Sequence, residues 1–158
     1  MKLSIPGLSD YGFLSKQNEY NAFGGNGDNL SPALSWENAP QQAKSFALTV
    51  YDPDAPTGSG FWHWVAFNIP ADTTALKAGA GYPDAQARFT QASSDFGQPG
   101  YGGCCPPEGD IPHRYIFTLH ALSCEDLGVT ADLPNAVIRF LIQMHTLQAA
   151  SVTTLYQR

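Results

Sequence analysis

The sequence predicts a single domain that is mainly β. Its 158 residues match the size of one ordinary globular domain, about 100–200 residues, which can bury a sizeable core. It has 15 glycines, 12 prolines, 12% aromatic residues and only 14% charged residues. That balance is typical of a loop-rich β protein rather than a helical bundle or a disordered chain. Several runs also alternate with the period of two expected of a strand. We therefore expect one β domain over residues 1–158.

The first half of the chain predicts two strands joined by a broad turn. Residues 1–40 are rich in Gly, Asn, Ser and Pro, which favours loops and short strands. The run 46–51 is β-prone, and two prolines and two glycines within 52–60 prevent it from continuing. The run 61–69 predicts a second strand, and its period of two places on one face Phe61, His63, Val65, Phe67 and Ile69.

A third strong strand is predicted after a long irregular stretch. Residues 71–92 indicate no more than a short helical turn around Leu76. Residues 93–112 form a Gly/Pro loop, and loops of this length are often functional. The run 113–122 predicts a strand that places on one face His113, Tyr115, Phe117 and Leu119.

The C-terminal part predicts one helix and a last strand. Pro134 and apolar spacings of three and four indicate an amphipathic helix from about Asp132 to Ala150. Strand propensity returns at 152–156. We expect the apolar stripe of the helix to pack on the core, with a dimer contact as the alternative; the stripe comprises Leu133, Val137, Phe140, Leu141, Met144 and Leu147.

Charge, hydropathy and cysteine content exclude several classes of protein. With 8 basic against 14 acidic residues and a net charge of −6, the chain lacks the basic footprint of nucleic-acid binding. No run approaches the roughly 18 apolar residues of a membrane span, and the first residues lack a signal-peptide core. The three cysteines, Cys104, Cys105 and Cys124, have no CxxC spacing, so we expect reduced thiols in a soluble cytoplasmic protein.

Three polar side chains are predicted to meet at one edge of the sheet. Antiparallel pairing of the first two strands brings Asp52 close to His63, and the third strand adds His113 if its start is aligned with them. A carboxylate beside two imidazoles could hold a small anion or serve acid/base chemistry. Each residue also has a structural interpretation: Asp52 can cap the turn, His63 can be a core histidine and His113 can close the loop. The three are permissible zinc ligands, but their spacing specifies no site, and we expect no metal.

Four motifs follow one another in the central part of the chain. They are residues 30–36 (LSPALSW), 52–56 (DPDAP), 61–70 (FWHWVAFNIP) and 102–115 (GGCCPPEGDIPHRY). In this order they resemble the phosphatidylethanolamine-binding protein family, which includes Raf kinase inhibitor protein, and the C-terminal region resembles the family's bacterial branch. The resemblance implies a β-sandwich with a large central sheet, a second smaller sheet and a few helices, one of them near the C-terminus. It also implies a small anion-binding pocket at the edge of the sheet.

The resemblance assigns roles residue by residue. It implies that Asp52, His63 and His113 build the pocket. It places around them Pro56, Pro106, Pro107, Tyr115, Cys105 and, as the second acid of the turn motif, Asp54. The chain departs from the pattern at Cys104, where bacterial relatives usually carry proline. The resulting Cys104-Cys105 pair adds possible redox reactivity.

Three functions are compatible with these sequence features. The favoured one is a module that binds a phosphate-like anion, such as a phospholipid head group, without a cofactor and without catalysis. The resemblance implies that such a module regulates a protein kinase or another enzyme, and that it forms a homodimer. The alternative is a hydrolase in which a pocket histidine activates Cys105, a serine or water, although the chain has no Gly-x-Ser-x-Gly motif. The third is a lipid carrier. Such a protein needs a cavity for acyl chains, and no stretch of the sequence indicates one.

Overall fold

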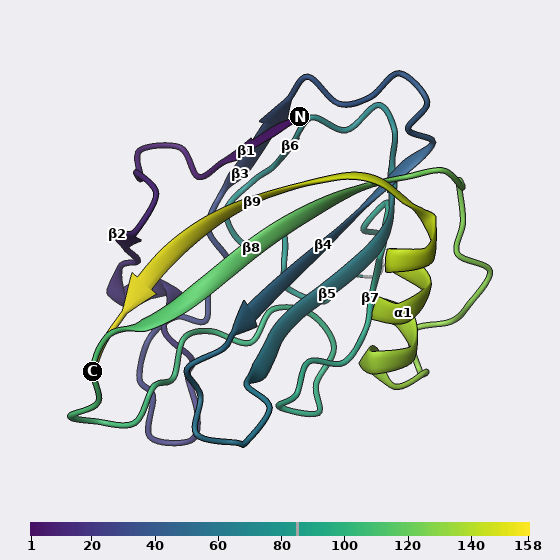
Figure 1. Cartoon of the computed structure of the whole chain (residues 1–158). Helices are drawn as coiled ribbons and strands as arrows, with labels where there is room; N and C mark the ends of the chain where they lie inside the picture. Colours follow the sequence, from purple (N-terminus) through teal and green to yellow (C-terminus); the bar gives the residue numbers. More distant parts are fainter. Residues whose placement is uncertain (85) are drawn as a thin grey trace.

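A computed structural model, which describes residues 1–84 and 86–158, shows two β-sheets packed face to face with one α-helix on the outer side (Figure 1). The large sheet has the strand order β2-β9-β8-β4-β5-β7 and the small sheet the order β1-β3-β6. This arrangement confirms the predicted fold class. The elements are β1 (Lys2–Ser4), β2 (Gly12–Phe13), a short 3-10 helix (Lys16–Asn18), β3 (Leu34–Glu37), β4 (Ser45–Asp52), β5 (Phe61–Pro70), β6 (Ala75–Leu76), β7 (Thr90–Gln91), β8 (His113–Leu122), α1 (Asn135–His145) and β9 (Thr146–Tyr156).

The main core lies between the two sheets. Strand β8 contributes Tyr115, Phe117 and Leu119 to it, as the alternation of its sequence predicts. From the small sheet, Trp36 meets Phe46 of β4 edge to face, with ring centroids 5.5 Å apart. Burial of this apolar surface, at roughly 25 cal/mol per Å², is the main force that holds the sheets together.

A second core lies between the large sheet and α1. Ile138 and Ile142 are 0% and 1% exposed and pack with residues of the sheet's outer face, which include Val65 and Phe67. Their spacing of four places both isoleucines on one side of the helix. One face of the large sheet is therefore covered by the small sheet, and part of the other face is covered by α1.

The predicted extent and orientation of the helix are wrong. Helix α1 ends at His145, and β9 begins at Thr146, which pairs with Leu122 of β8. Residues 146–150 therefore form strand hydrogen bonds that outweigh their helical pattern. The helix also has apolar residues on two sides, and the isoleucines face the sheet. Most of the predicted stripe is exposed instead, namely Val137 at 44%, Phe140 at 62%, Met144 at 67% and Leu147 at 47%.

Two β-bulges in β5 alter the predicted face of that strand. Val50 pairs with Trp64 and Tyr51 with Trp62, which leaves His63 as an extra residue. His63 consequently faces the same side as Tyr115, with ring centroids 5.1 Å apart. A second extra residue follows between the partners of Phe46 and Leu48. The prediction of one common face is therefore wrong: Val65 and Phe67 face α1, whereas Phe61, His63 and Ile69 face the other way.

The expected helical turn around Leu76 is also wrong. Leu76 lies in the short strand β6 and pairs with Leu34 of β3. Its side chain is 7% exposed and belongs to the core between the sheets. A two-residue strand carries no periodicity of its own, and only the partner strand identifies it.

We predict that Asn68 is a stability determinant at the second bulge. It has a φ of 56°, and its Oδ1 accepts the Leu127 N–H at 3.0 Å. Asn68→Ala should lower the free energy of unfolding by about 1–3 kcal/mol, because alanine disfavours left-handed backbone and the hydrogen bond is lost. Asn68→Gly restores the backbone freedom and should lose less in the same denaturant titration. Equal losses would contradict a backbone contribution.

Candidate functional site

Three strand ends meet at one edge of the large sheet. Asp52 ends β4, His63 is the third residue of β5 and His113 is the first residue of β8. Since β4 runs antiparallel to both neighbours, its end lies beside their starts. The three side chains are only 2–3% exposed. The structure thus brings the three predicted residues to one place.

Asp52 both caps the turn and holds a histidine. Its Oδ1 accepts the backbone N–H groups of Asp54 at 2.8 Å and Ala55 at 3.1 Å. Its Oδ2 lies 2.8 Å from Nδ1 of His113. The two interpretations of Asp52 are compatible, because one carboxylate has an oxygen for each task.

His113 lies between two carboxylates. Besides Asp52 at Nδ1, its Nε2 lies 3.2 Å from Oδ2 of Asp110, which belongs to the loop before β8. An ionised carboxylate only accepts hydrogen bonds, so these contacts match a ring with an N–H at both nitrogens. Asp52, at the end of β4, therefore orients the His113 ring at Nδ1, while Asp110 of the loop contacts its Nε2.

His63 has a different environment. Its Nδ1 lies 2.8 Å from the carbonyl oxygen of Gly102 and 3.1 Å from that of Gly103. Carbonyls only accept, so Nδ1 carries the proton. Burial lowers the pKa of His63 below its ordinary value, and the opposing effects of the Gly102 carbonyl and Asp52 do not cancel this. The ring is thus neutral near pH 7, with a lone pair on Nε2.

These side chains open into a pocket of about 290 Å³. Seven of its lining residues are among those that the sequence predicts: Asp52, Pro56, His63, Cys105, Pro106, Pro107 and His113. Six more line it that the sequence analysis missed: Phe23, Ala55, Thr57, Phe61, Phe96 and Arg158. Of these, only Phe61 had a usable signal, since it shares the strand face of His63.

Two predicted residues stand outside the lining set. Asp54 is paired with Arg114, with 2.8 Å between Oδ1 and Nη2, and this pair braces the turn against β8. Tyr115 lies behind His63 and is 1% exposed. Its hydroxyl oxygen is buried without a hydrogen-bond partner among the described residues, and burial raises its pKa. It is therefore a protonated donor without an acceptor, a state that costs roughly 1–3 kcal/mol.

The mouth of the pocket is formed by aromatic rings and one arginine. Phe23 is 75% exposed, with a φ of 52°, and its ring stacks near that of Phe96 at 5.8 Å. Arg158 reaches across from the end of β9: its Nε donates to the carbonyl of Pro106 at 2.6 Å, and its Nη1 donates to that of Gly24 at 2.8 Å. The arginine thus ties two loops together and places a positive charge at the mouth.

Comparison with known proteins matches this architecture. The sequence model of the phosphatidylethanolamine-binding protein family matches residues 9–157. The chain belongs to this family. It is 45% identical to the UPF0098 protein YbhB of Escherichia coli K12 over 161 aligned residues, which cover 99% of each chain. The crystal structure of E. coli YbcL, described as a new member of the mammalian PEBP family, superposes with a TM-score of 0.95 at 39% identity and covers 99% of this chain and 98% of YbcL. A PEBP homolog of Chlamydia trachomatis, CT736, superposes with a TM-score of 0.84 at 27% identity, covering 99% and 97%.

In this family member the pocket cysteine is not an activated nucleophile. Burial raises the pKa of Cys105, and the positive charge of Arg158 does not reverse this. The Cys105 thiol faces the carbonyl oxygens of Phe23 at 3.6 Å and Ala22 at 3.9 Å. Neither pocket histidine bonds to it, so the base that a thiol nucleophile requires is missing from its hydrogen bonds. All three cysteines are free thiols in the structure.

The described residues add two observations on metals and membranes. They contain no group of three or more His, Cys, Asp or Glu side chains placed to hold a metal ion. Within the same part of the chain, no helix has the length and hydropathy to span a membrane.

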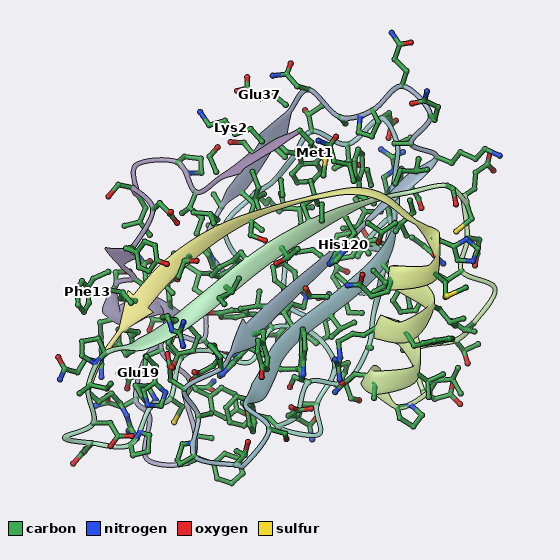
Figure 2. The ribbon with its side chains drawn as sticks, in the orientation of Figure 1. Met1, Lys2, Phe13, Glu19, Glu37 and His120 are labelled. Atoms are coloured by element: carbon green, nitrogen blue, oxygen red, sulfur yellow. The ribbon has the colours of Figure 1, made fainter. Side chains whose placement is uncertain are left out.

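Glu19 anchors the loop that forms the Phe23 side of the pocket. It is 1% exposed, and Figure 2 shows it beside the end of β9. Its carboxylate accepts from Lys16 Nζ at 2.7 Å, from the Asn26 N–H at 2.9 Å and from the Tyr156 hydroxyl. Burial by itself raises the pKa of Glu19, but these hydrogen bonds outweigh burial and lower it. The buried carboxylate thus joins the loop to β9.

We expect Glu19→Gln to lower the free energy of unfolding by roughly 1.5–3 kcal/mol at pH 7, since charged hydrogen bonds are lost. A pKa that is lower in the folded state stabilises above the unfolded value, near 4.5 for Glu, and this contribution disappears as the pH falls below it. The difference from the unmodified protein should therefore shrink below about pH 4.5 in urea titrations. Glu37→Gln, on the exposed end of β3, is the matched control. An equal loss in both variants would contradict the anchoring role.

Proposed function

We propose that this protein binds small phosphate-like anions in the pocket at the edge of its large sheet. Membership of the phosphatidylethanolamine-binding protein family supports a ligand-binding role. The observation that carries the proposal is that Asp52, His63 and His113 line one pocket with Arg158 at its mouth. A phosphate group supplies acceptor oxygens and negative charge to the donors of His63 and Arg158.

Arg158, His63 and Asp52 have different roles in binding such an anion. Arg158 uses Nε and Nη1 for the two loops, and its Nη2 makes no hydrogen bond within the described residues. That nitrogen is the permanent cationic donor. His63 becomes a donor when Nε2 takes up a proton, which a neighbouring anion favours. Asp52 keeps both of its oxygens occupied by the turn and His113, so it repels the ligand less than a free carboxylate would.

The mouth limits what the anion can be attached to. Phe23, Phe61 and Phe96 line the pocket beside the polar groups. Their apolar surface suits an organic substituent on a phosphate ester better than a free inorganic ion. A phospholipid head group and a phosphorylated side chain share this ester chemistry, and binding of phosphoethanolamine compared with a phosphoserine peptide distinguishes the two sources.

We further propose a regulatory role for this pocket. A pocket that holds a phosphorylated group suits a regulatory module that acts on a protein kinase or another enzyme. We place this module in the cytoplasm, and we include a homodimer among its forms. Size-exclusion chromatography with light scattering tests the oligomeric state.

In the hydrolase alternative Asp52 and His113 would form the catalytic pair, but within the described residues no nucleophile is hydrogen-bonded to His113. Nε2 of His113 faces Asp110, where a serine or cysteine protease would have its nucleophile. Incubation with a panel of chromogenic carboxylic esters and phosphoesters should give no turnover above that of an Asp52→Asn variant. Turnover that depends on Asp52 or His113 would contradict the binding-only role.

Anion affinity should increase as the pH falls. The pKa of His63 lies below its ordinary value of 6.5 in the free protein, and a bound anion raises it, so binding takes up a proton. Affinity for sulfate, whose charge is constant in this range, should rise through about pH 6.5 and below, by at most about tenfold per pH unit for one linked proton. Calorimetric titration in buffers of different ionisation enthalpy measures both the affinity and the proton uptake.

Two variants make this test specific. His63→Ala should weaken sulfate binding and flatten its pH dependence. His145→Ala removes a histidine at the end of α1, outside the pocket, and should change neither. If both variants behave alike, or if His63→Ala keeps the full pH dependence, His63 is not the titrating donor.

A further inference from the structure

A second hollow lies on the opposite face of the large sheet, against α1. Its two adjoining parts have volumes of about 310 and 750 Å³ and share Trp62, Ala136 and Arg139. None of their lining residues lines the pocket of Asp52, His63 and His113, which we call the anion pocket. The alternation of side chains along β5 explains the separation, because the neighbours Trp62 and His63 lie on opposite faces of the sheet. We call this hollow the α1 cleft.

A positive charge without a counterion is held in the α1 cleft. The guanidinium carbon of Arg139 lies 3.8 Å from the ring centroid of Trp62, which stacks in turn on Tyr51 at 4.3 Å. Its Nε donates to Asn135 Oδ1 at 3.2 Å. Among the described residues, no carboxylate lies within ion-pair distance of Arg139, and its terminal nitrogens donate no hydrogen bond.

The nearby carboxylate of Asp95 forms no ion pair with this arginine and is held by other donors. Asp95 accepts the backbone N–H of Trp62 on Oδ2 at 2.8 Å and the Asn135 side-chain N–H on Oδ1 at 2.8 Å. Burial lowers the pKa of Arg139, which Asp95 and Tyr51 only partly oppose. The guanidinium is therefore partly desolvated, oriented by Trp62, and left with four N–H donors on its terminal nitrogens.

His120 supplies an acceptor in the part of the α1 cleft between the sheet and the helix. Figure 2 shows it over the middle of the large sheet. The Thr146 hydroxyl donates its one proton to the carbonyl of Ile142 at 2.7 Å. Its oxygen, 3.2 Å from His120 Nδ1, must therefore accept from that nitrogen. Burial lowers the pKa of His120 to about 4, so the ring is neutral and Nε2 keeps its lone pair.

No hydrogen bond within the described residues uses that lone pair, although His120 is only 4% exposed. The α1 cleft thus offers a forked cationic donor and a neutral acceptor. Apolar walls from Trp62, Phe140 and Ile142 lie around them. A ligand that satisfies all three needs one anionic group, one hydrogen-bond donor and an apolar body.

We propose that the α1 cleft is a second binding site, which takes a small organic carboxylate with an apolar body and a hydroxyl or similar donor. The carboxylate pairs with the terminal nitrogens of Arg139, whose planar fork suits two oxygens. The donor bonds to Nε2 of His120. Asp95 and Asp132 also line the cleft, so a monoanionic carboxylate is favoured over a dianionic phosphate ester. This inference does not rest on the function proposed for the anion pocket.

The test titrates the protein at pH 7 with 4-hydroxybenzoate and two probes that each lack one feature. Calorimetry should show one site with a Kd of about 1 mM or tighter. The neutral 4-hydroxybenzamide, which lacks the charge, should bind at least about tenfold more weakly. Benzoate, which lacks the hydroxyl, should bind several-fold more weakly because His120 Nε2 then stays unpaired.

Variants assign the binding to the named residues. Arg139→Gln should weaken 4-hydroxybenzoate at least about tenfold, and Arg139→Lys should retain part of the affinity because it keeps the charge without the fork. His120→Phe should bind 4-hydroxybenzoate and benzoate equally. His63→Ala, in the anion pocket, should change nothing. Circular dichroism and a denaturant titration verify that each cleft variant is folded.

Three results would overturn the proposal. One is no saturable binding of 4-hydroxybenzoate up to about 10 mM. Another is unchanged affinity in Arg139→Gln. The third is loss of binding in His63→Ala, which would place the carboxylate in the anion pocket instead.

Discussion

The pairing of β4 with β5 on one side and β8 on the other is the interaction on which the rest of the structure depends. It places Tyr51 opposite both Trp62 and Ile116, so the end of β4 lies against two strand starts. The buried polar groups of the anion pocket follow from that alignment rather than from their separation along the chain. The same strand sends Val50 into the core between the sheets and Thr49 toward α1. The two ladders of hydrogen bonds formed by β4 thus support both hollows.

Much of this arrangement could be predicted from local pattern. The strand-forming runs of β4, β5 and β8 are recognisable in the sequence, and the turn after Asp52 places His63 close to it. Three features could not be predicted because they depend on residues that are distant in sequence. The bulge at His63 exists only relative to β4, the orientation of α1 depends on which of its two apolar sides meets the sheet, and Phe23 and Arg158 reach the pocket from opposite ends of the chain. Single-segment periodicity contains none of this information.

The two hollows differ in how their charge is supplied. In the anion pocket His113 is matched by Asp52 and Asp110, and His63 is neutral until a ligand arrives. Its charge therefore adjusts to the occupant, with Arg158 as the constant contribution. In the α1 cleft the cation is permanent and the histidine stays neutral. The two proposed anion sites are compatible with a net charge of −6, because the local donors, and not the overall field, determine short-range recognition.

The extra residue at His63 also limits how the protein can change by descent. Trp62 pairs with Tyr51 and Trp64 with Val50, so deletion of His63 alone would leave both tryptophans in register and remove only the pocket histidine. Deletion of Trp62 would instead place His63 opposite Tyr51, on the face of α1, because side chains alternate across a strand. The pocket would then lose its histidine and the α1 cleft its indole ring in a single event. A length change in this segment can therefore remove one hollow or both, depending on which residue is lost, whereas a point substitution can alter either hollow without touching the other.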